Sequence, residues 1–245
     1  MLWRLQEDIM TVKERDPAAP SAAGILINYP GVQAVNAHRF ENLLWRCGRR
    51  GIARFLSQCT RFFTGIEIHP GATLGRRVFI DHGMGLIIGE TAVVGDDVTL
   101  FQGVTLGGTG KETGKRHPTV EDGAIIGVGA SVLGSVTVGA RSKVGGGAVV
   151  VDNVPQDATV VGIPGHVVVQ NGVRIAAAEP LRRELLPDPF GEELAALTAR
   201  VAQLEEQGVQ DGGIAPDQQL QEILKRLDTL EAELNILDEL VMSLV

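Results

Sequence analysis

Three short stretches of the sequence carry side chains suited to acid–base chemistry. They are 67–70 (Glu-Ile-His-Pro), 80–85 (Ile-Asp-His-Gly-Met-Gly) and 107–118, a polar Gly-rich run that contains Arg116 and His117. A hydroxyl nucleophile needs a base that works near neutral pH, and histidine is best matched to that task. The imidazole in turn needs a carboxylate to hold it in one tautomer. Together the stretches offer imidazoles, carboxylates and a guanidinium for activating a hydroxyl.

An aliphatic residue returns at every sixth position through the middle of the chain, apart from two insertions. All thirteen positions hold Ile, Leu or Val, and Gly follows seven of them. Because six is a multiple of the strand period of two, each aliphatic side chain returns to the same inward face, and Gly lets the backbone turn. The repeat predicts stacked coils around one aliphatic column. The positions are Ile68, Leu74, Ile80, Ile88, Val94, Leu100, Leu106, Val120, Ile126, Val132, Val138, Val144 and Val150.

The two insertions coincide with the polar stretches. The first places His82 on an irregular segment beside Gly83 and Gly85, and the second projects a loop with Arg116 and His117. A regular solenoid interrupts its register only where something other than stacking is selected, so we expect the functional site at these insertions. A β-sandwich is the alternative fold, but it needs turns at roughly 8–12 residues rather than six.

Segments with helical spacing precede the repeat, so residues 1–64 are predicted to form a small helical lead-in domain. These segments are 1–15, 31–47 and 50–63, separated by proline and glycine. The β-helix is predicted over 65–170.

A linker at 171–189 leads to an acidic helical tail at 190–245, which holds 12 acidic and 3 basic residues. Within 217–245, apolar residues alternate spacings of three and four, which indicates a coiled coil. The alternative is a helix folded back onto the β-helix or the lead-in domain. The apolar positions are Leu220, Ile223, Leu227, Leu230, Leu234, Leu237, Val241 and Leu244.

Composition excludes several classes of function. The net charge is −8, and without a basic stripe the chain offers no footprint for nucleic acid. Glu7 and Asp8 interrupt any secretory signal, and no apolar run reaches membrane-spanning length, so we expect a cytoplasmic protein that does not bind membranes. Cys47 and Cys59 lack the spacing of a metal or redox motif and are expected to be free thiols.

Seven motifs in this order resemble the serine acetyltransferases. They are Arg15-Asp-Pro-Ala, Glu67-Ile-His-Pro, Ile80-Asp-His-Gly-Met-Gly, Ile88-Gly-Glu-Thr, Val104-Thr-Leu-Gly-Gly-Thr-Gly-Lys, Lys115-Arg-His-Pro and Gly162-Ile-Pro-Gly. The resemblance covers roughly residues 10–170. It implies a left-handed parallel β-helix with three hexapeptides per coil, and transfer of acetyl from acetyl-CoA to L-serine. This is the first step of cysteine biosynthesis, and it requires no metal.

The resemblance also assigns roles to single residues. His82 would be the general base for the serine hydroxyl, partnered by Glu67, where many family members have Asp. Arg116 would bind the serine carboxylate through its planar fork, and Asp81 the ammonium. The remaining serine-binding positions match Asp16, which would close the pocket, and His117.

Backbone N–H groups near Gly107 and Gly108 are candidates for stabilising the tetrahedral oxyanion, because glycine permits close approach. CoA would lie along the C-terminal coils, in a groove between neighbouring subunits. The candidate residues there are Val128, Lys143 and Gly146.

The family resemblance implies a homotrimer or a dimer of trimers, L-cysteine as a feedback inhibitor, and cysteine synthase as a candidate partner. Three other functions remain open. One is a hexapeptide acetyltransferase for another hydroxyl acceptor. Another is a zinc carbonic anhydrase, which would need three convergent imidazoles. The last is a non-enzymatic trimeric scaffold whose function lies in the tail.

Overall fold

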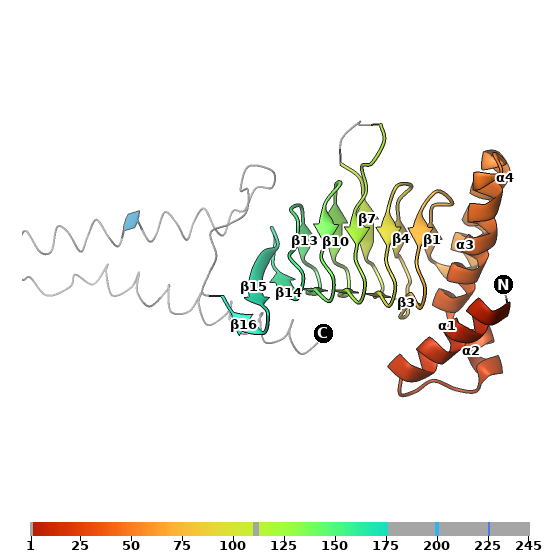
Figure 1. Ribbon diagram of the computed structural model, residues 1–245, viewed down its shortest axis with the longest axis horizontal. Helices are drawn as coiled ribbons and strands as arrows, with labels where there is room; N and C mark the ends of the chain where they lie inside the picture. The colour runs from red at the N-terminus through yellow and green to blue at the C-terminus, as the bar shows by residue number, and fades with distance from the viewer. Residues whose placement is uncertain (1, 110–112, 176–198, 201–224, 226–245) are drawn as a thin grey trace, which may run out of the picture. The chain divides into compact units, whose positions relative to one another are not determined.

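The computed structural model describes residues 2–109, 113–175, 199–200 and 225, in which a group of helices is followed by a long stack of strands (Figure 1). The chain divides into two units, with the change between Leu181 and Arg182, and the helices and strands within residues 2–174 belong to the first unit. The predicted tail lies outside the described residues, apart from 199–200 and 225. Its coiled coil stays a prediction.

The helices begin and end at residues with the expected local chemistry. At the start of α2, the Ser21 hydroxyl accepts a hydrogen bond from the amide of Gly24. Pro30 is the first residue of α3, where its missing N–H removes no helical bond, and Gly65 ends α4 in the left-handed region at φ 73°. The apolar spacing does not predict α2. The helices are α1 (Leu2–Arg15), α2 (Ala22–Asn28), α3 (Pro30–Arg46) and α4 (Arg50–Thr64).

A small core fixes these helices to the strands. Phe79 points outward from its strand, yet it is only 5% exposed because it packs among apolar side chains of the helical part. Those side chains are Val12, Ile25 and Val32. A buried ion pair between Asp8 and Arg39 joins α1 to α3, with two N–O distances of 2.6 and 2.9 Å. The lead-in helices are therefore docked against the first coil.

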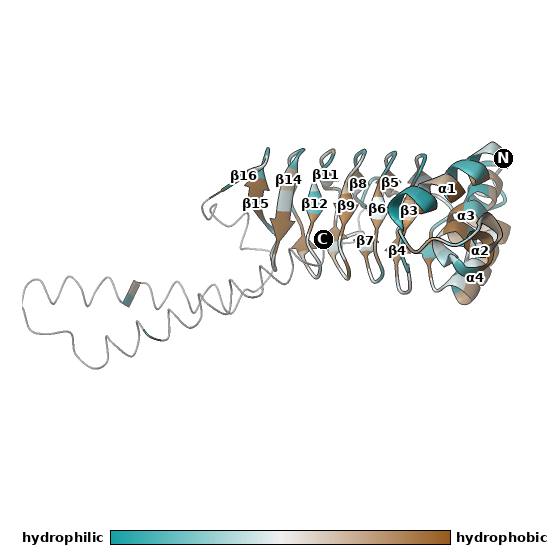
Figure 2. Cartoon of the chain, turned by 90° about the horizontal axis from the view of Figure 1, so that it is seen from below, coloured by the Kyte–Doolittle hydropathy of each residue, from teal (hydrophilic) through white to brown (hydrophobic). Residues whose placement is uncertain are grey.

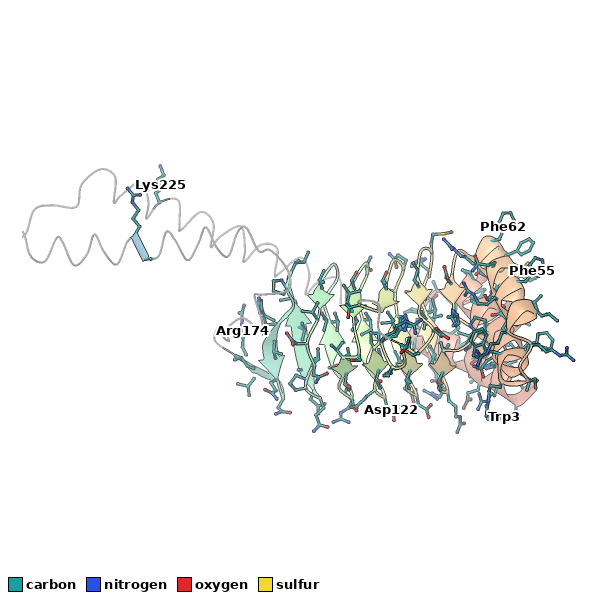
Figure 3. The ribbon with its side chains drawn as sticks, turned by 90° about the horizontal axis from the view of Figure 1, so that it is seen from above. Trp3, Phe55, Phe62, Asp122, Arg174 and Lys225 are labelled. Carbon is teal, nitrogen blue, oxygen red and sulfur yellow. The ribbon has the colours of Figure 1, made fainter. Side chains whose placement is uncertain are left out.

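α4 is buried along one side only. Ala53 and Ser57 are buried, while Phe55 and Phe62 are 68% and 84% exposed and point away from the molecule (Figure 3). The helix ends beside the first strand of the stack.

Short strands form three sheets, in the orders β1-β4-β7-β10-β13, β11-β8-β5-β2 and β16-β15-β14-β12-β9-β6-β3, and they are parallel up to β14. We call them the five-, four- and seven-stranded sheets. Three successive strands make one coil. The strands are β1 (Glu67–Ile68), β2 (Thr73–Leu74), β3 (Phe79–Ile80), β4 (Ile87–Ile88), β5 (Val93–Val94), β6 (Thr99–Leu100), β7 (Thr105–Gly107), β8 (Thr119–Val120), β9 (Ile125–Ile126), β10 (Ser131–Leu133), β11 (Thr137–Val138), β12 (Lys143–Val144), β13 (Val149–Val150), β14 (Ala158–Val161), β15 (His166–Gln170) and β16 (Val173–Arg174).

The hexapeptide anchors stack in register. Ile68 pairs with Ile88, Ile88 with Leu106, and Leu106 with Val132, all in parallel. Of the thirteen predicted anchors, all but the half-buried Leu74 are buried. Figure 2 shows hydrophobic residues on the strands and hydrophilic ones at many of the turns. The predicted aliphatic column is confirmed, and the register follows from the repeat because a shift by one residue would turn every anchor outward.

The last two strands depart from the parallel stack. β15 runs antiparallel to β14, and β16 antiparallel to β15, so the repeat stops here. This antiparallel end covers the edge that β14 would otherwise leave unpaired in the seven-stranded sheet.

Candidate active site

The predicted site residues gather at two different corners of the β-helix. The His82 corner is the column of turns that lead from the seven-stranded to the five-stranded sheet, and its first turn is 81–86. The Arg116 corner is the column that leads from the five-stranded to the four-stranded sheet, and it includes 89–92 and the loop to 118. The width of the five-stranded sheet separates the two corners within one chain.

His82 is placed by an unusual backbone. Its φ is 56°, in the left-handed region, and Gly83 and Gly85 also have positive φ. A side chain at Gly83 would be strained by the positive φ of 74°, and its Cβ would lie 2.5 Å from a methyl carbon of Ile66. The tight turn that results leaves the imidazole exposed at the corner. A histidine in this position can meet a substrate from outside the chain.

Asp16 and Asp81 lie beside His82. Asp16 follows α1, and one oxygen of its carboxylate accepts a hydrogen bond from the Ala18 amide at 2.8 Å, while the other accepts one from the Tyr29 hydroxyl. The Tyr29 hydrogen bond is the main cause that lowers the pKa of Asp16, and the charge of His82 contributes. The same bond raises the pKa of Tyr29 to about 12, with a contribution from Asp81. These four side chains therefore form one electrostatic group.

Glu67 has other partners within the chain. Its carboxylate lies 2.9 Å from Arg61 and 4.0 Å from Arg54, both on α4. In the described part of the chain, no hydrogen bond joins it to His82. The turn that holds His82 does stack on the segment just before Glu67, because the Gly85 amide donates to the Gly65 carbonyl at 2.9 Å. The expected pairing of Glu67 with His82 stays a prediction.

Arg116 is held at its corner by a carboxylate from the previous coil. Its Nη2 lies 2.6 Å from Glu90, and this hydrogen bond is the main cause that lowers the pKa of Glu90. The Thr91 hydroxyl accepts hydrogen bonds from the amides of Arg116 and His117 at 3.0 and 3.1 Å. The return of the long loop is thereby fixed on the β4–β5 turn.

His117 is 8% exposed, and its burial lowers its pKa. Its ring lies directly on Gly89, where a Cβ would come within 1.9 Å of Cδ2, so the glycine is required for the ring to pack there. Its Nδ1 lies 2.9 Å from the Thr91 hydroxyl. His69 lies nearby, in edge contact with Trp45, and burial lowers its pKa to about 4.

The residues expected at acetyl-CoA divide between the corners. Gly107 ends β7, and a Cβ on Gly108 would lie 3.2 Å from the His117 ring, so both glycines belong to the Arg116 corner. Val128 and Gly146 lie on the His82 corner in later coils. Backbone hydrogen bonds stack the successive turns of this corner on one another. The Gly103 amide donates to the Met84 carbonyl, the Gly129 amide to the Gln102 carbonyl, and the Gly147 amide to the Val128 carbonyl. Lys143 begins β12 and is exposed.

Three residues of these groups were not predicted from the sequence to take part in the site. Glu90 and Thr91 stand in the quoted motif Ile88-Gly-Glu-Thr, so a pattern was available to find them. Tyr29 stands in none of the motifs, and only the packing of α3 brings it to Asp16. Among the described residues, no group of three or more His, Cys, Asp or Glu is placed to hold a metal ion. None of the described helices is long and apolar enough to cross a membrane.

Parallel sheets wound from hexapeptides, with an exposed histidine on an inserted turn, define a hexapeptide-repeat acyltransferase. The chain is 55% identical to the serine acetyltransferase of Bacillus licheniformis over 203 residues, which is 83% of this chain and 93% of the relative. It is also 55% identical to the Bacillus subtilis serine acetyltransferase over 200 residues, covering 82% and 91% of the two chains. The chain belongs to the serine acetyltransferase family. No protein-family model matches it.

Solved structures agree with this assignment. A crystal structure of the Neisseria gonorrhoeae serine acetyltransferase matches with a TM-score of 0.67 and 41% identity over 69% of this chain and 65% of that chain. A serine acetyltransferase in complex with cysteine matches with a TM-score of 0.68 and 39% identity, over 69% of this chain and 66% of that chain. The Brucella abortus enzyme in complex with coenzyme A matches with a TM-score of 0.67 and 41% identity, over 70% of this chain and 68% of that chain. The chain thus spans about two thirds of the solved chains. The predicted left-handed β-helix is confirmed.

Proposed function

We propose that this protein transfers the acetyl group of acetyl-CoA to the hydroxyl of L-serine, giving O-acetyl-L-serine and CoA, the first step of cysteine biosynthesis. The observation that carries the proposal is the exposed His82 imidazole beside Asp16 and Asp81, on the fold of a family named for this reaction. The two carboxylates suit an ammonium group, and Arg116 suits a carboxylate. Serine carries both groups.

The chemical step follows from these roles. His82, oriented by Glu67, takes the proton of the serine hydroxyl while the serine oxygen attacks the thioester carbonyl carbon. The carbonyl oxygen becomes an oxyanion, which the backbone N–H groups near Gly107 and Gly108 stabilise. The C–S bond then breaks, and the CoA thiolate takes the proton back from the imidazolium. Ester and free thiol are the products, with no net proton change.

The division of the site between two corners supports an oligomer. We propose a homotrimer, as a single trimer or a pair of trimers, in which the His82 corner of one copy faces the Arg116 corner of the next. Acetyl-CoA then lies in the groove between copies, along the later turns of the His82 corner. The residues proposed to line it are Val128, Lys143 and Gly146.

Mixed assembly tests this arrangement. His82→Ala and Arg116→Ala proteins are each expected to be nearly inactive, but refolding them together restores sites with an intact His82 from one copy and an intact Arg116 from another. Random mixing at equal amounts makes about one site in four complete in a closed ring of three. Recovery of about a quarter of the wild-type rate supports the shared site. No recovery from a mixed trimer places both groups within one copy.

Release of free thiol from acetyl-CoA tests the reaction itself. Strict dependence on L-serine supports the proposal, whereas a preference for homoserine or an amino sugar would assign the protein to another hydroxyl acceptor. A scaffold without catalytic function would release no CoA with any acceptor. A zinc enzyme would hold stoichiometric metal after purification.

Cysteine has the ammonium and carboxylate of serine, so we propose that it inhibits by occupying the serine site. The cysteine complex of a solved relative supports this proposal. Inhibition should be overcome by serine in steady-state assays. Cysteine synthase, which consumes O-acetylserine, is the proposed protein partner, and co-elution of the two purified enzymes in gel filtration tests it.

A further inference from the structure

The docking of α3 brings Tyr29 close to Asp16, Asp81 and His82. It lies between α2 and α3 and precedes Pro30, the first residue of α3. Gly31 then packs against the end of β3, where a Cβ would come within 2.2 Å of the Ile80 carbonyl oxygen. Only glycine allows this approach. Because Ile80 directly precedes Asp81, the docking of α3 on this carbonyl places Tyr29 beside the turn that carries His82.

The Tyr29 hydroxyl completes the hold on Asp16. One oxygen of Asp16 is occupied by the Ala18 amide, and the other accepts from Tyr29. The preceding residue, Arg15, is itself fixed, since its guanidinium lies 2.8 Å from Asp97 and 2.9 Å from the Thr99 hydroxyl. The Asp16 carboxylate is therefore held by its own loop, by Tyr29 and by the anchored end of α1.

We propose that Tyr29 is a positioning residue that fixes the Asp16 carboxylate for the ammonium group of serine. This inference rests on the proposed function. A carboxylate oxygen that accepts one hydrogen bond keeps further acceptor capacity, so Asp16 can receive the phenol and the ammonium together. The phenol fixes the orientation of the Asp16 carboxylate, and the charges of Asp16 and Asp81 attract the ammonium group of serine.

The titration of the pair is consistent with this role. A Tyr29 pKa of about 12 keeps the phenol protonated, and thus a donor, at neutral pH. The lowered pKa of Asp16 keeps its carboxylate ionised. The aromatic ring packs in the same small core as Val12 and Ile25, so a phenylalanine preserves the packing and removes only the hydroxyl.

Tyr29→Phe tests the proposal by steady-state thiol release. Loss of the hydrogen bond should raise the KM for serine about tenfold, while kcat and the KM for acetyl-CoA change less than about twofold. The change should vanish in an Asp16→Asn background, because Tyr29 acts through that carboxylate. Ser21→Ala is the matched control. It removes the N-cap of α2 on the same segment but does not touch Asp16, so its serine KM should stay at the wild-type value.

A second measurement is independent of turnover. Tyr29 is the single tyrosine in the chain, so the ultraviolet absorbance of phenolate reports it alone. Its pKa should fall toward the ordinary value for tyrosine in Asp16→Asn, and stay high in Ser21→Ala. A pKa unaffected by Asp16→Asn overturns the pairing.

Three kinetic results overturn the positioning role alone, in a wild type that acetylates serine normally. The first is a serine KM that does not change in Tyr29→Phe. The second is a rise in serine KM on adding Tyr29→Phe to Asp16→Asn that equals the rise in the wild-type background. The third is a rise in Ser21→Ala as large as that in Tyr29→Phe. A wild type that releases no CoA with serine overturns the proposed function, and this inference with it.

Discussion

The guanidinium of Arg116 is paired with the carboxylate of Glu90, 2.6 Å away on the preceding coil. Among the described residues the pairing with Glu90 uses Nη2, so the other donors of the planar group can bind a second carboxylate. Glu90 therefore fixes the direction in which the guanidinium points. The pair also explains why a long loop can return to one defined position on the Arg116 corner.

Glu90→Gln should weaken serine binding. The neutral amide keeps the size of the side chain but loses the charge-assisted hydrogen bond, so the serine KM should rise by about three- to tenfold with little change in the KM for acetyl-CoA. Arg116→Lys should give a larger rise, because it removes the bidentate donor itself. Equal changes in both KM values for Glu90→Gln would contradict the assignment.

His82→Ala should lower kcat by about 10²–10⁴, because the base for the serine hydroxyl is lost. The exposed side chain contributes nothing to the aliphatic column, so circular dichroism and sedimentation should match the wild type. Turnover near the wild-type rate would remove His82 from the mechanism.

Glu67→Gln should lower kcat about tenfold or more if this carboxylate orients His82 in the working enzyme. Arg61→Gln is the control, since it removes the 2.9 Å ion pair of Glu67 but keeps the carboxylate. Its kcat should stay within about twofold of wild type. Equal losses in the two variants would instead make the ion pair, and not a link to His82, the function of Glu67.

Folding stability should fall as the pH decreases from 7 to 5. His38 is 3% exposed, and burial lowers its pKa to about 4, below the ordinary value of 6.5. The unfolded chain binds this proton first, so stability is present above pH 6.5 and is lost between there and pH 4. Linkage gives a loss of about 2 kcal/mol from His38 between pH 7 and 5. Urea unfolding at fixed protein concentration should show a smaller loss in His38→Gln; an equal loss would rule out this histidine.

Truncation after Pro189 should leave serine acetyltransferase activity largely intact. It should change assembly, because the predicted coiled coil of 217–245 would hold helices of different copies together. Light scattering and thiol release on the truncated protein check both expectations. An unchanged mass would exclude the assembly role, and lost activity in a folded trimer would show that the tail belongs to the catalytic unit.

The sequence by itself determined the β-helix. Its signal is local and repeated, since each hexapeptide specifies one strand and one turn, and thirteen copies agree on the same inward face. The inserted turns also indicated His82, Arg116 and His117 as candidate site residues, because a break in a regular repeat is visible without a structure. The end of the repeat was less visible. β15 and β16 each run antiparallel to the strand before them, and their apolar residues do not differ in type from those of the coils.

Only the tertiary structure decided which groups meet. The corner on which a turn lies depends on how the coils close, so the sequence did not reveal that Asp81 and Arg116 occupy opposite edges of one sheet. The packing of α4 gave Glu67 two arginine partners that the sequence did not predict. Tyr29 reaches Asp16 because Gly31 lets α3 touch the Ile80 carbonyl. Such contacts join separate elements through docking geometry, and no periodicity in the chain records that geometry.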